Sequence, residues 1–271
     1  MARKDREDRP DSPQYLARRK EFRRLMTICG RNPVLEALLR ADVEVVRLHL
    51  AKGSRGEAVD RILKLAGEKG VEVREVSAER VSQISRNSRQ DQGIAADVRT
   101  PTYGLAEDYL ADPPAQFALL ALDGVTTPRN VGTAIRSATA GGMDGIVLPE
   151  QGGCGIIPLV IKTSAGTVFA ARILRCETLP PVLERCAELG VEVCVLESRA
   201  KESLFDRKPA PREVYVLGGE AEGVSAPVRR LATRSLSIPM AAGVESLNVS
   251  VAAALVAYRR LLTSGGRKAD A

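Results

Sequence analysis

The chain has 271 residues, 44% of them hydrophobic and 3% aromatic, which is enough apolar material for one large or two modest domains. Its single histidine and its five cysteines without a CxxC pair argue against histidine-based catalysis, a disulfide framework and a metal site. No apolar run reaches the roughly 18 residues that a membrane helix needs, and the charged start lacks the apolar segment of a signal peptide. We therefore expect a cytoplasmic protein with reduced cysteines and no membrane partner.

Positive charge is concentrated in the first part of the chain. Residues 1–100 contain 22 Lys and Arg against 16 Asp and Glu, whereas residues 101–271 contain 18 of each. A basic front end is typical of a protein that binds a polyanion, and a solvated basic tail without a partner is the alternative. Residues 1–24 mix charges of both signs with two prolines, so we expect a disordered basic arm there.

Residues 25–99 show alternating helix and strand patterns. We expect strands at 43–50, 71–76 and 93–98, and helices at 34–40, at 56–69 and after a cap at Ser77. Asn32 and Pro33 have the residue types of an N-cap and a first helical residue. The alternation predicts a small α/β domain with a mostly parallel sheet, in which His49 is a packed strand residue. The polar, cationic segment 85–92 is interpreted as a loop that contacts a partner.

Residues 100–116 contain three prolines and a glycine without periodicity, which predicts a linker. Beyond it, strands are expected at 117–122, 145–148, 171–176, 191–196, 213–217 and 236–240, and helices at 131–140, 158–165, 181–189, 227–232 and 249–261. Continuous apolar strands are typical of a parallel sheet that is buried on both faces. The pattern predicts one doubly wound α/β domain over residues 117–263, followed by a polar tail at 264–271.

Three polar loops follow the carboxyl ends of predicted buried strands, at 123–130, 218–223 and 240–248, which is the edge where α/β sheets bind ligands. The loops and the helices after them provide an acid, an arginine, two amides and a hydroxyl: Asn130, Arg136, Glu220, Ser246 and Asn248. Taken singly, helix capping explains the amides and the hydroxyl, and an exposed helix face explains the arginine. No GxGxxG or Walker pattern supports a dinucleotide or nucleoside triphosphate site. Together the five groups suit the transfer of an already activated group.

Three motifs carry a family resemblance. They are NVGTAIR at 130–136, LGGEAEG at 217–223, and SIPM at 237–240 followed by ESLNVSV at 245–251. In this order they resemble the SpoU/TrmH branch of the SPOUT RNA 2′-O-ribose methyltransferases, and the resemblance covers about 25–262. A lesser element is SAG at 164–166, and the front domain contributes GRNPV at 30–34 and QGI at 92–94. The family often has His before that last segment, where this chain has Asp91.

The resemblance implies a C-terminal SPOUT domain with a trefoil knot and a mostly parallel sheet, preceded by a small ribosomal-protein-like α/β domain that binds the substrate. It implies S-adenosylmethionine as the cofactor and a homodimer through the catalytic domain. The implied cofactor-binding residues are Leu196, Gly218, Gly219, Ile238, Met240 and Leu247. Catalysis is assigned to Asn130, Arg136, Glu220, Ser246 and Asn248, and RNA binding to Arg31, Asn32, Arg86, Arg89 and Gln92.

The expected function is RNA (ribose-2′-O)-methyltransferase, with 23S rRNA as the first substrate and tRNA as the second. A non-catalytic RNA-binding or ribosome-assembly protein of the same fold is the alternative. The family's proposals make Arg136 the general base, but a guanidinium is a poor base, so we expect it mainly to position the RNA. The RNA and the nucleotide stay open, as does a housekeeping or an antibiotic-resistance role.

Overall fold

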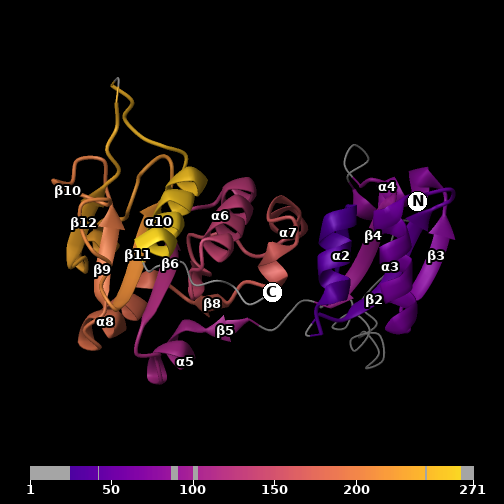
Figure 1. The fold of residues 1–271 in the computed structure, drawn as a ribbon, viewed down its shortest axis with the longest axis horizontal. Coiled ribbons are helices and arrows are strands. Elements are labelled where there is room, and N and C mark those ends of the chain that lie inside the picture. Colours follow the sequence, from indigo (N-terminus) through magenta and orange to yellow (C-terminus); the bar gives the residue numbers. More distant parts are fainter. Residues whose placement is uncertain (1–24, 42, 87–90, 100–102, 242, 264–271) are drawn as a thin grey trace, which may run out of the picture.

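The computed structural model describes residues 25–41, 43–86, 91–99, 103–241 and 243–263. Figure 1 shows two α/β lobes side by side, the first part of the chain in one and the remainder in the other. The basic arm expected at 1–24 and the polar tail expected at 264–271 lie outside the described residues. Among the residues that are described, none of the helices has the length and hydropathy to cross a lipid bilayer.

The front lobe is a four-stranded sheet with three helices. Its elements are β1 (Leu25–Cys29), α2 (Arg31–Leu39), β2 (Val45–Ala51), α3 (Glu57–Glu68), β3 (Glu72–Val76), α4 (Ala78–Ser85) and β4 (Ile94–Arg99). The strand order is β1-β4-β2-β3, and β4 runs antiparallel to both of its neighbours. Only β2 and β3 are parallel, so the expectation of a mostly parallel sheet was wrong. The sequence pattern identifies the other elements but misses the strand β1, and it does not show that β4 enters between β1 and β2 in the opposite direction.

Of three local expectations for the front lobe, one is wrong and two are confirmed. Helix α2 begins at Arg31, so Asn32 lies inside the helix and not at its N-cap. Gly30 takes the cap position with φ 96°, a backbone angle that residues with a Cβ rarely adopt. The cap at Ser77 is confirmed, because its side chain accepts a hydrogen bond from the Arg80 backbone N–H. His49 is buried and its Nε2 lies 3.0 Å from Asp97, which confirms a packed strand residue.

The larger lobe contains an eight-stranded sheet in the order β10-β12-β9-β11-β6-β7-β8-β5, and its paired strands are all parallel. The strands are β5 (Gly104–Leu105), β6 (Phe117–Asp123), β7 (Gly145–Pro149), β8 (Ile173–Cys176), β9 (Glu192–Leu196), β10 (Glu202–Ser203), β11 (Arg212–Gly218) and β12 (Arg234–Ser237). The helices are α5 (Ala106–Ala111), α6 (Pro128–Ala140), α7 (Pro158–Thr163), the 3-10 turn η1 (Thr167–Phe169), α8 (Leu179–Glu188), α9 (Ala226–Arg230) and α10 (Val249–Thr263).

Helices cover both faces of this sheet, as the apolar strand runs predict. Side chains of β6 alternate between two cores: Leu120 and Leu122 pack in the core beneath α6, α7 and α10, and Leu119 and Ala121 in the core beneath α5, α8 and α9. Such burial on both sides explains why the strand sequence is apolar without interruption. The doubly wound architecture is therefore confirmed, and every loop that follows a strand opens at one edge of the sheet.

The segment predicted as a linker is partly ordered structure of the larger lobe. Within 100–116, residues 104–111 form β5 and α5, and Ala106 and Leu110 are buried in the second core. The Tyr109 ring stacks edge-on against Phe117, with 5.6 Å between the ring centroids. A two-residue strand and a six-residue helix are too short to show a period, and the flanking prolines hide them in the sequence.

The two lobes touch through segments that the sequence marked separately. Strand β1 contacts α7, and α2 contacts η1. Gly166 has φ +85°, and a Cβ added there would lie 2.5 Å from the Glu36 Cβ of α2. The SAG segment at 164–166 therefore forms a close backbone contact with the helix that contains most of GRNPV. Only glycine permits this approach.

Candidate active site

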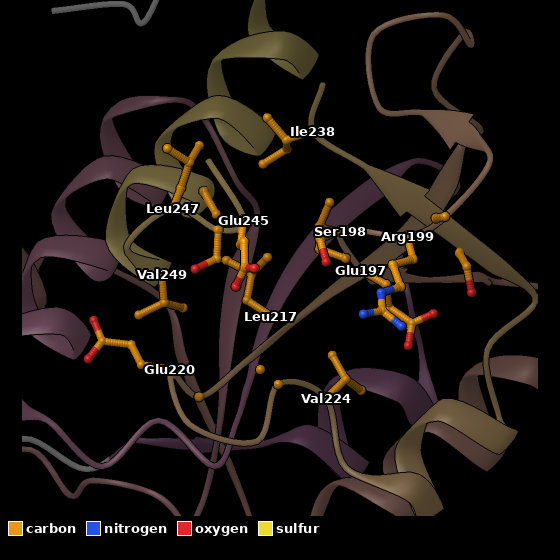
Figure 2. Close-up of a pocket in the computed structure, with 18 of the residues that line it drawn as sticks. Glu197, Ser198, Arg199, Leu217, Glu220, Val224, Ile238, Glu245, Leu247 and Val249 are labelled. Atoms are coloured by element: carbon orange, nitrogen blue, oxygen red, sulfur yellow. The ribbon is translucent and has the colours of Figure 1, made fainter. Parts of the chain in front are cut away.

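A cavity of about 910 Å³ opens at the carboxyl edge of the large sheet, between the loops that follow β9, β11 and β12 (Figure 2). Its volume lies within the range of small-molecule sites. Leu196, Leu217, Ile238 and Leu247 provide apolar walls, and glutamates and arginines provide the charge. Figure 2 shows Glu220 and Arg199 at opposite sides of this cavity.

The six residues that the family resemblance implies for cofactor binding all line this cavity: Leu196, Gly218, Gly219, Ile238, Met240 and Leu247. They come from the ends of β9 and β11 and from the loops after β11 and β12, and the first and last of them, Leu196 and Leu247, are 51 residues apart in the chain. Parallel strands bring these loops together because their carboxyl ends share one edge of the sheet. The structure thus shows the convergence, and the role of the six residues stays a prediction.

Three polar side chains from distant segments meet beside the cavity. Asn130 Nδ2 donates to Glu220 Oε1 at 2.8 Å, and Asn248 Nδ2 donates to the same oxygen at 2.7 Å. Asn248 Nδ2 also donates to Asn130 Oδ1 at 3.1 Å. The carboxylate of Glu220 is therefore held between two amides, one from the first motif and one from the third. We refer to Asn130, Glu220 and Asn248 as the polar triad.

The capping explanation applies to one amide of the triad and not to the other. Asn248 Oδ1 accepts from the Ser250 backbone N–H at 2.9 Å and from Ser250 Oγ at 2.6 Å, so it caps α10 as well as contacting Glu220. Asn130 is the third residue of α6, which begins at Pro128 with Thr127 at its N-cap. N-capping is therefore wrong for Asn130, and its amide is free to join the triad.

Arg136 and Ser246 take different positions. Ser246 lines the cavity, as predicted. Arg136 lies six residues after Asn130 on α6, which turns its side chain about 120° away around the helix. It is exposed and forms no hydrogen bond or ion pair with any described residue. Of the five predicted catalytic residues, Glu220, Ser246 and Asn248 line the cavity. Asn130 is connected to it through Glu220 and Asn248, and Arg136 is not among the lining residues.

Glycines shape the loop that presents Glu220. A Cβ added to Gly218 would lie 1.9 Å from the Gly223 carbonyl carbon, and one added to Gly219 would lie 2.4 Å from the Gly124 carbonyl oxygen. The loop folds back on itself, with the Gly223 N–H donating to the Gly219 carbonyl at 2.9 Å. Two successive glycines therefore allow backbone to pack against backbone at the end of β11.

Sequence reasoning missed the loop after β9. Glu197, Ser198, Arg199 and Ala200 line the cavity, and Glu197 pairs with Arg229 of α9 at 2.5 Å. No motif marks this loop, although its position after the predicted strand 191–196 is the same signal that identified the others. Glu245, which belongs to the third motif but has no role among the predicted site residues, also lines the cavity.

Four of the five residues predicted to bind RNA are described, and they lie on the front lobe. Gln92 Oε1 accepts from the Arg31 backbone N–H at 2.9 Å, so this side chain caps α2 next to the exposed Asn32. Arg86 is exposed at the end of α4 with φ 52°, and Arg89 lies outside the described residues. Arg31, Asn32 and Gln92 are thus brought together. Their contact with RNA stays a prediction.

Asp91, where the family often has His, has a structural role. It is buried and accepts hydrogen bonds from Ser82 Oγ at 2.8 Å and from the Gly93 N–H at 2.9 Å. The contact with Ser82 ties the segment before β4 to α4, and the contact with Gly93 holds the turn within that segment. The carboxylate at this position therefore shapes the loop from within and is not itself offered to a partner.

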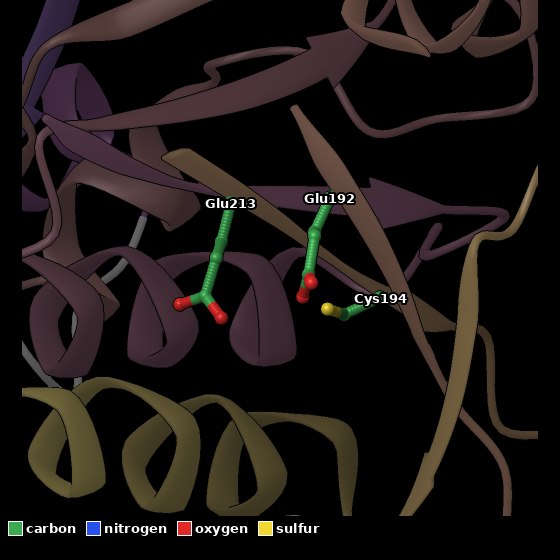
Figure 3. A group of neighbouring side chains, drawn as sticks. All are labelled: Glu192, Cys194 and Glu213. Carbon is green, nitrogen blue, oxygen red and sulfur yellow. The ribbon is translucent and has the colours of Figure 1, made fainter. Parts of the chain in front are cut away.

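Figure 3 shows Glu192, Cys194 and Glu213, whose ligand atoms lie within 4.8 Å of one another, as in a metal site. Arg207 explains the group, because it pairs with Glu192 at 2.5 Å and with Glu213 at 3.0 Å. Burial raises the pKa of Cys194 to about 12, so this thiol stays protonated. Burial likewise raises the pKa of Cys186, a thiol on α8 outside this group, to about 12. We interpret the group as a buried ion-pair cluster of the core.

Comparison with protein families gives two matches that together cover most of the chain. Residues 118–258 match the SpoU rRNA Methylase family. Residues 27–104 match the family described as RNA 2′-O ribose methyltransferase substrate binding. The first match contains the cavity and the polar triad, and the second contains the front lobe.

Two relatives that match most of this chain support these family matches. A protein of Mycolicibacterium gilvum (strain PYR-GCK), named as an uncharacterized tRNA/rRNA methyltransferase, is 34% identical over 84% of this chain and 74% of its own. A Mycobacterium tuberculosis (strain ATCC 25177 / H37Ra) protein with the same name is 35% identical over 85% of this chain and 72% of its own.

Solved structures share the fold of both lobes. The crystal structure of an RNA 2′-O ribose methyltransferase has a TM-score of 0.77 and 26% identity, covering 91% of this chain and 92% of that one. The SpoU methyltransferase AviRb from Streptomyces viridochromogenes, solved in complex with the cofactor AdoMet, has a TM-score of 0.73 and 20% identity, covering 90% and 92%.

Proposed function

The chain belongs to the SpoU methyltransferase family, and on that premise we propose that it transfers a methyl group from S-adenosylmethionine to a ribose 2′-hydroxyl of RNA. The observation that carries the proposal is the polar triad, which joins the first, second and third motifs at the rim of one cavity. The 26% identical neighbour is named for the same reaction.

The cavity fits S-adenosylmethionine in size and chemistry. Apolar walls at Leu196, Ile238 and Leu247 suit an adenine ring. Gly218 and Gly219 leave their backbone open to close approach by a ligand, and carboxylates in the lining suit a cation. The complex of AviRb with AdoMet shows that this fold can hold the cofactor. When bound, the cofactor supplies a methyl group already activated on sulfur.

The chain's own residues then have to align the acceptor. Alignment of two reactants in a site contributes roughly 7–11 kcal/mol, so little further chemistry is required. Glu220 is fixed by two amides, and it keeps the Gly218–Gly223 loop in place against the cofactor cavity. Asn130 and Ser246 provide polar groups beside the ribose, and Arg136 holds a neighbouring phosphate or polarises the hydroxyl.

We propose a homodimer through the face of α10 because that face is apolar and exposed. Val251, Tyr258 and Leu262 are 46%, 44% and 78% exposed and lie at helical spacing on one side of α10. Helix α6, with the exposed Arg136, packs beside α10. A second copy bound to this face would bring its Arg136 toward the cavity of the first, where one chain alone does not place it. The order β10-β12-β9, in which the last strand enters between two earlier ones, supports a knotted chain.

The proposed substrate is ribosomal RNA, with tRNA as the second candidate and the cytoplasm as the location. The matched family is named for rRNA, whereas the relatives are named for both RNAs. The decisive experiment is to map ribose methylation in cellular RNA with and without the gene, and to restore it in vitro with purified protein. We expect one or a few 2′-O-methyl sites to disappear and reappear. Unchanged RNA, together with no binding of S-adenosylmethionine, would instead favour a non-catalytic RNA-binding protein.

Gly218→Ala is expected to weaken S-adenosylmethionine binding at least about tenfold, because the new Cβ overlaps the Gly223 backbone and forces the Glu220 loop outward. Titration calorimetry measures the loss. Gly67→Ala is the matched control and should leave the affinity unchanged. A Cβ at this position meets nothing within 4 Å, and Gly67 lies in α3 of the front lobe. Equal affinities of Gly218→Ala and wild type would show that the loop does not depend on this close contact.

The basic arm gives a separate prediction. RNA affinity should fall with salt, with a log–log slope of about −0.7 per phosphate neutralised on a single strand. Deleting residues 1–24, which contain nine Lys and Arg, should flatten that slope. Filter binding over a series of salt concentrations measures the slope, and an unchanged value would assign the arm no part in RNA binding.

A further inference from the structure

The cavity contains three glutamates, two of which have partners in the protein. Glu197 pairs with Arg229 at 2.5 Å. Glu220 Oε1 accepts hydrogen bonds from both amides of the polar triad. Glu245 lines the same cavity, yet it forms no hydrogen bond or ion pair with any residue that the structure describes. With two arginines, Arg199 and Arg229, also in the lining, one negative charge is left over.

Glu245 is exposed, so a ligand in the cavity can reach its carboxylate. Figure 2 shows Glu245 on the same side of the cavity as Leu247 and Leu217. A cation bound beside this carboxylate would form a charge pair that water and salt screen in part. Glu245 also lies close in the chain to a residue whose side chain is held by several hydrogen bonds. Three residues later, Asn248 is held by Glu220, Asn130 and the first turn of α10.

The cofactor of the proposed reaction changes its charge during turnover. S-adenosylmethionine carries a sulfonium, an ammonium and a carboxylate, whereas the product S-adenosylhomocysteine has a neutral sulfur. Resting on the proposed function, we propose that Glu245 faces the sulfonium and is the specificity-determining residue that favours the charged donor over the spent product. A carboxylate that discriminates in this way promotes release of the product after each methyl transfer.

Glu220 is less suited to this task. Its Oε1 already accepts from two N–H groups, and both of those bonds orient it toward the triad at the rim. Glu197 is neutralised by a guanidinium. Only Glu245, among the described residues that line the cavity, combines a carboxylate with the absence of a protein partner.

The test is titration calorimetry of wild type and Glu245→Gln with three ligands: S-adenosylmethionine, S-adenosylhomocysteine and sinefungin, in which a protonated amine replaces the sulfonium. We expect Glu245→Gln to weaken the two cationic ligands about tenfold, the order expected for one partly screened charge pair, and the neutral-sulfur product less than about twofold. Added salt should reduce the wild-type preference for the cationic ligands.

Glu222→Gln is the matched control, because Glu222 is exposed, lies in the loop of Glu220 and is outside the cavity lining. It should leave all three affinities unchanged. Equal weakening of donor and product by Glu245→Gln, or no weakening at all, would overturn the assignment of Glu245 while leaving the proposed function intact. Failure of the wild-type protein to bind any of the three ligands would instead reject the proposed function.

Discussion

Arg136→Ala is expected to reduce methyl transfer by about a thousandfold or more, while the affinity for S-adenosylmethionine stays within about twofold of wild type. The reason is that Arg136 is exposed on α6 and lies outside the cavity lining, so it is available to RNA and not to the cofactor. Single-turnover methyl transfer measures the first quantity and calorimetry the second. A parallel loss of both would show that Arg136 helps to form the cofactor site.

Two further variants serve as controls: one tests whether the charge of Arg136 is sufficient, and the other whether the loss of any exposed helical arginine lowers the rate. Arg136→Lys keeps the charge but loses the planar, bidentate guanidinium, so we expect only partial recovery of the rate. Arg185→Ala removes an exposed helical arginine that pairs with Glu188 at 2.9 Å on α8, and it should leave the rate unchanged. A full rate for Arg136→Lys would mean that a point charge is sufficient.

Mixing two inactive variants tests whether Arg136 acts across a dimer. In a homodimer, Arg136→Ala and Asn248→Ala subunits that exchange freely would form mixed dimers in which one site has both residues intact. We expect random mixing to restore about a quarter of the wild-type rate. No recovery, despite subunit exchange, would place Arg136 and Asn248 in the site of the same chain.

The sequence predicted the larger lobe well because its strands are buried on both faces. Continuous apolar runs such as 117–122 allow few other structures, and parallel strands then oblige the loops after them to meet at one edge. That is why Glu220 and Asn248, which are 28 residues apart in the chain, were predicted at one site. In the structure, Asn248 Nδ2 lies 2.7 Å from Glu220 Oε1. The contact itself depends on the side chains and was not predictable.

The errors concern features that local sequence does not encode. The direction of β4 depends on where it enters the front sheet, and β5 and α5 are ordered by packing on β8 and Phe117. Asn130 lies inside α6 because this helix starts three residues earlier than expected, and Arg136, six residues later, lies on another side of the helix. Glu197 and Arg229 pair only after β9 and α9 have been placed by the fold.

The buried ion-pair cluster gives the largest expected effect on stability: Glu213→Ala should lower the free energy of unfolding by about 3–5 kcal/mol. Glu213 is fully buried, and its Oε1 lies 3.0 Å from Arg207 Nη2 and accepts from the Ala210 N–H at 2.8 Å. Its Oε2 accepts from Tyr215 Oη at 2.7 Å and from Arg260 Nη1 at 2.9 Å. Removing this carboxylate breaks the ion pair of Arg260 with Glu213 and takes from Arg207 one of its two close carboxylates, the other being Glu192 at 2.5 Å.

Hydrogen bonds beside this cluster also attach α10 to the sheet. Loss of stability here would therefore affect the helix that begins next to the candidate active site. Arg259 Nη1 donates to Tyr215 Oη at 2.7 Å, and Arg259 Nη2 donates to the Arg207 carbonyl, so the last turns of α10 are tied to β11 and to the segment before it. Burial, with Glu213 beside it, raises the pKa of Tyr215, which keeps its hydroxyl protonated as the donor to that carboxylate. Loosening α10 would also loosen Asn248 at its start.

Urea denaturation followed by circular dichroism measures the loss, as a fall in the midpoint at constant slope. Glu188→Ala is the control. The side chains of Glu188 and Arg185, which form an ion pair, are 66% and 48% exposed, so loss of this pair should change the free energy of unfolding by less than about 1 kcal/mol. If Glu213→Ala does not fold, Glu213→Gln keeps the shape and removes only the charge. If Glu213→Gln lowers the free energy of unfolding by less than about 1 kcal/mol, the two arginines tolerate a neutral partner. Hydrogen bonding and packing would then hold α10 without the charge of Glu213.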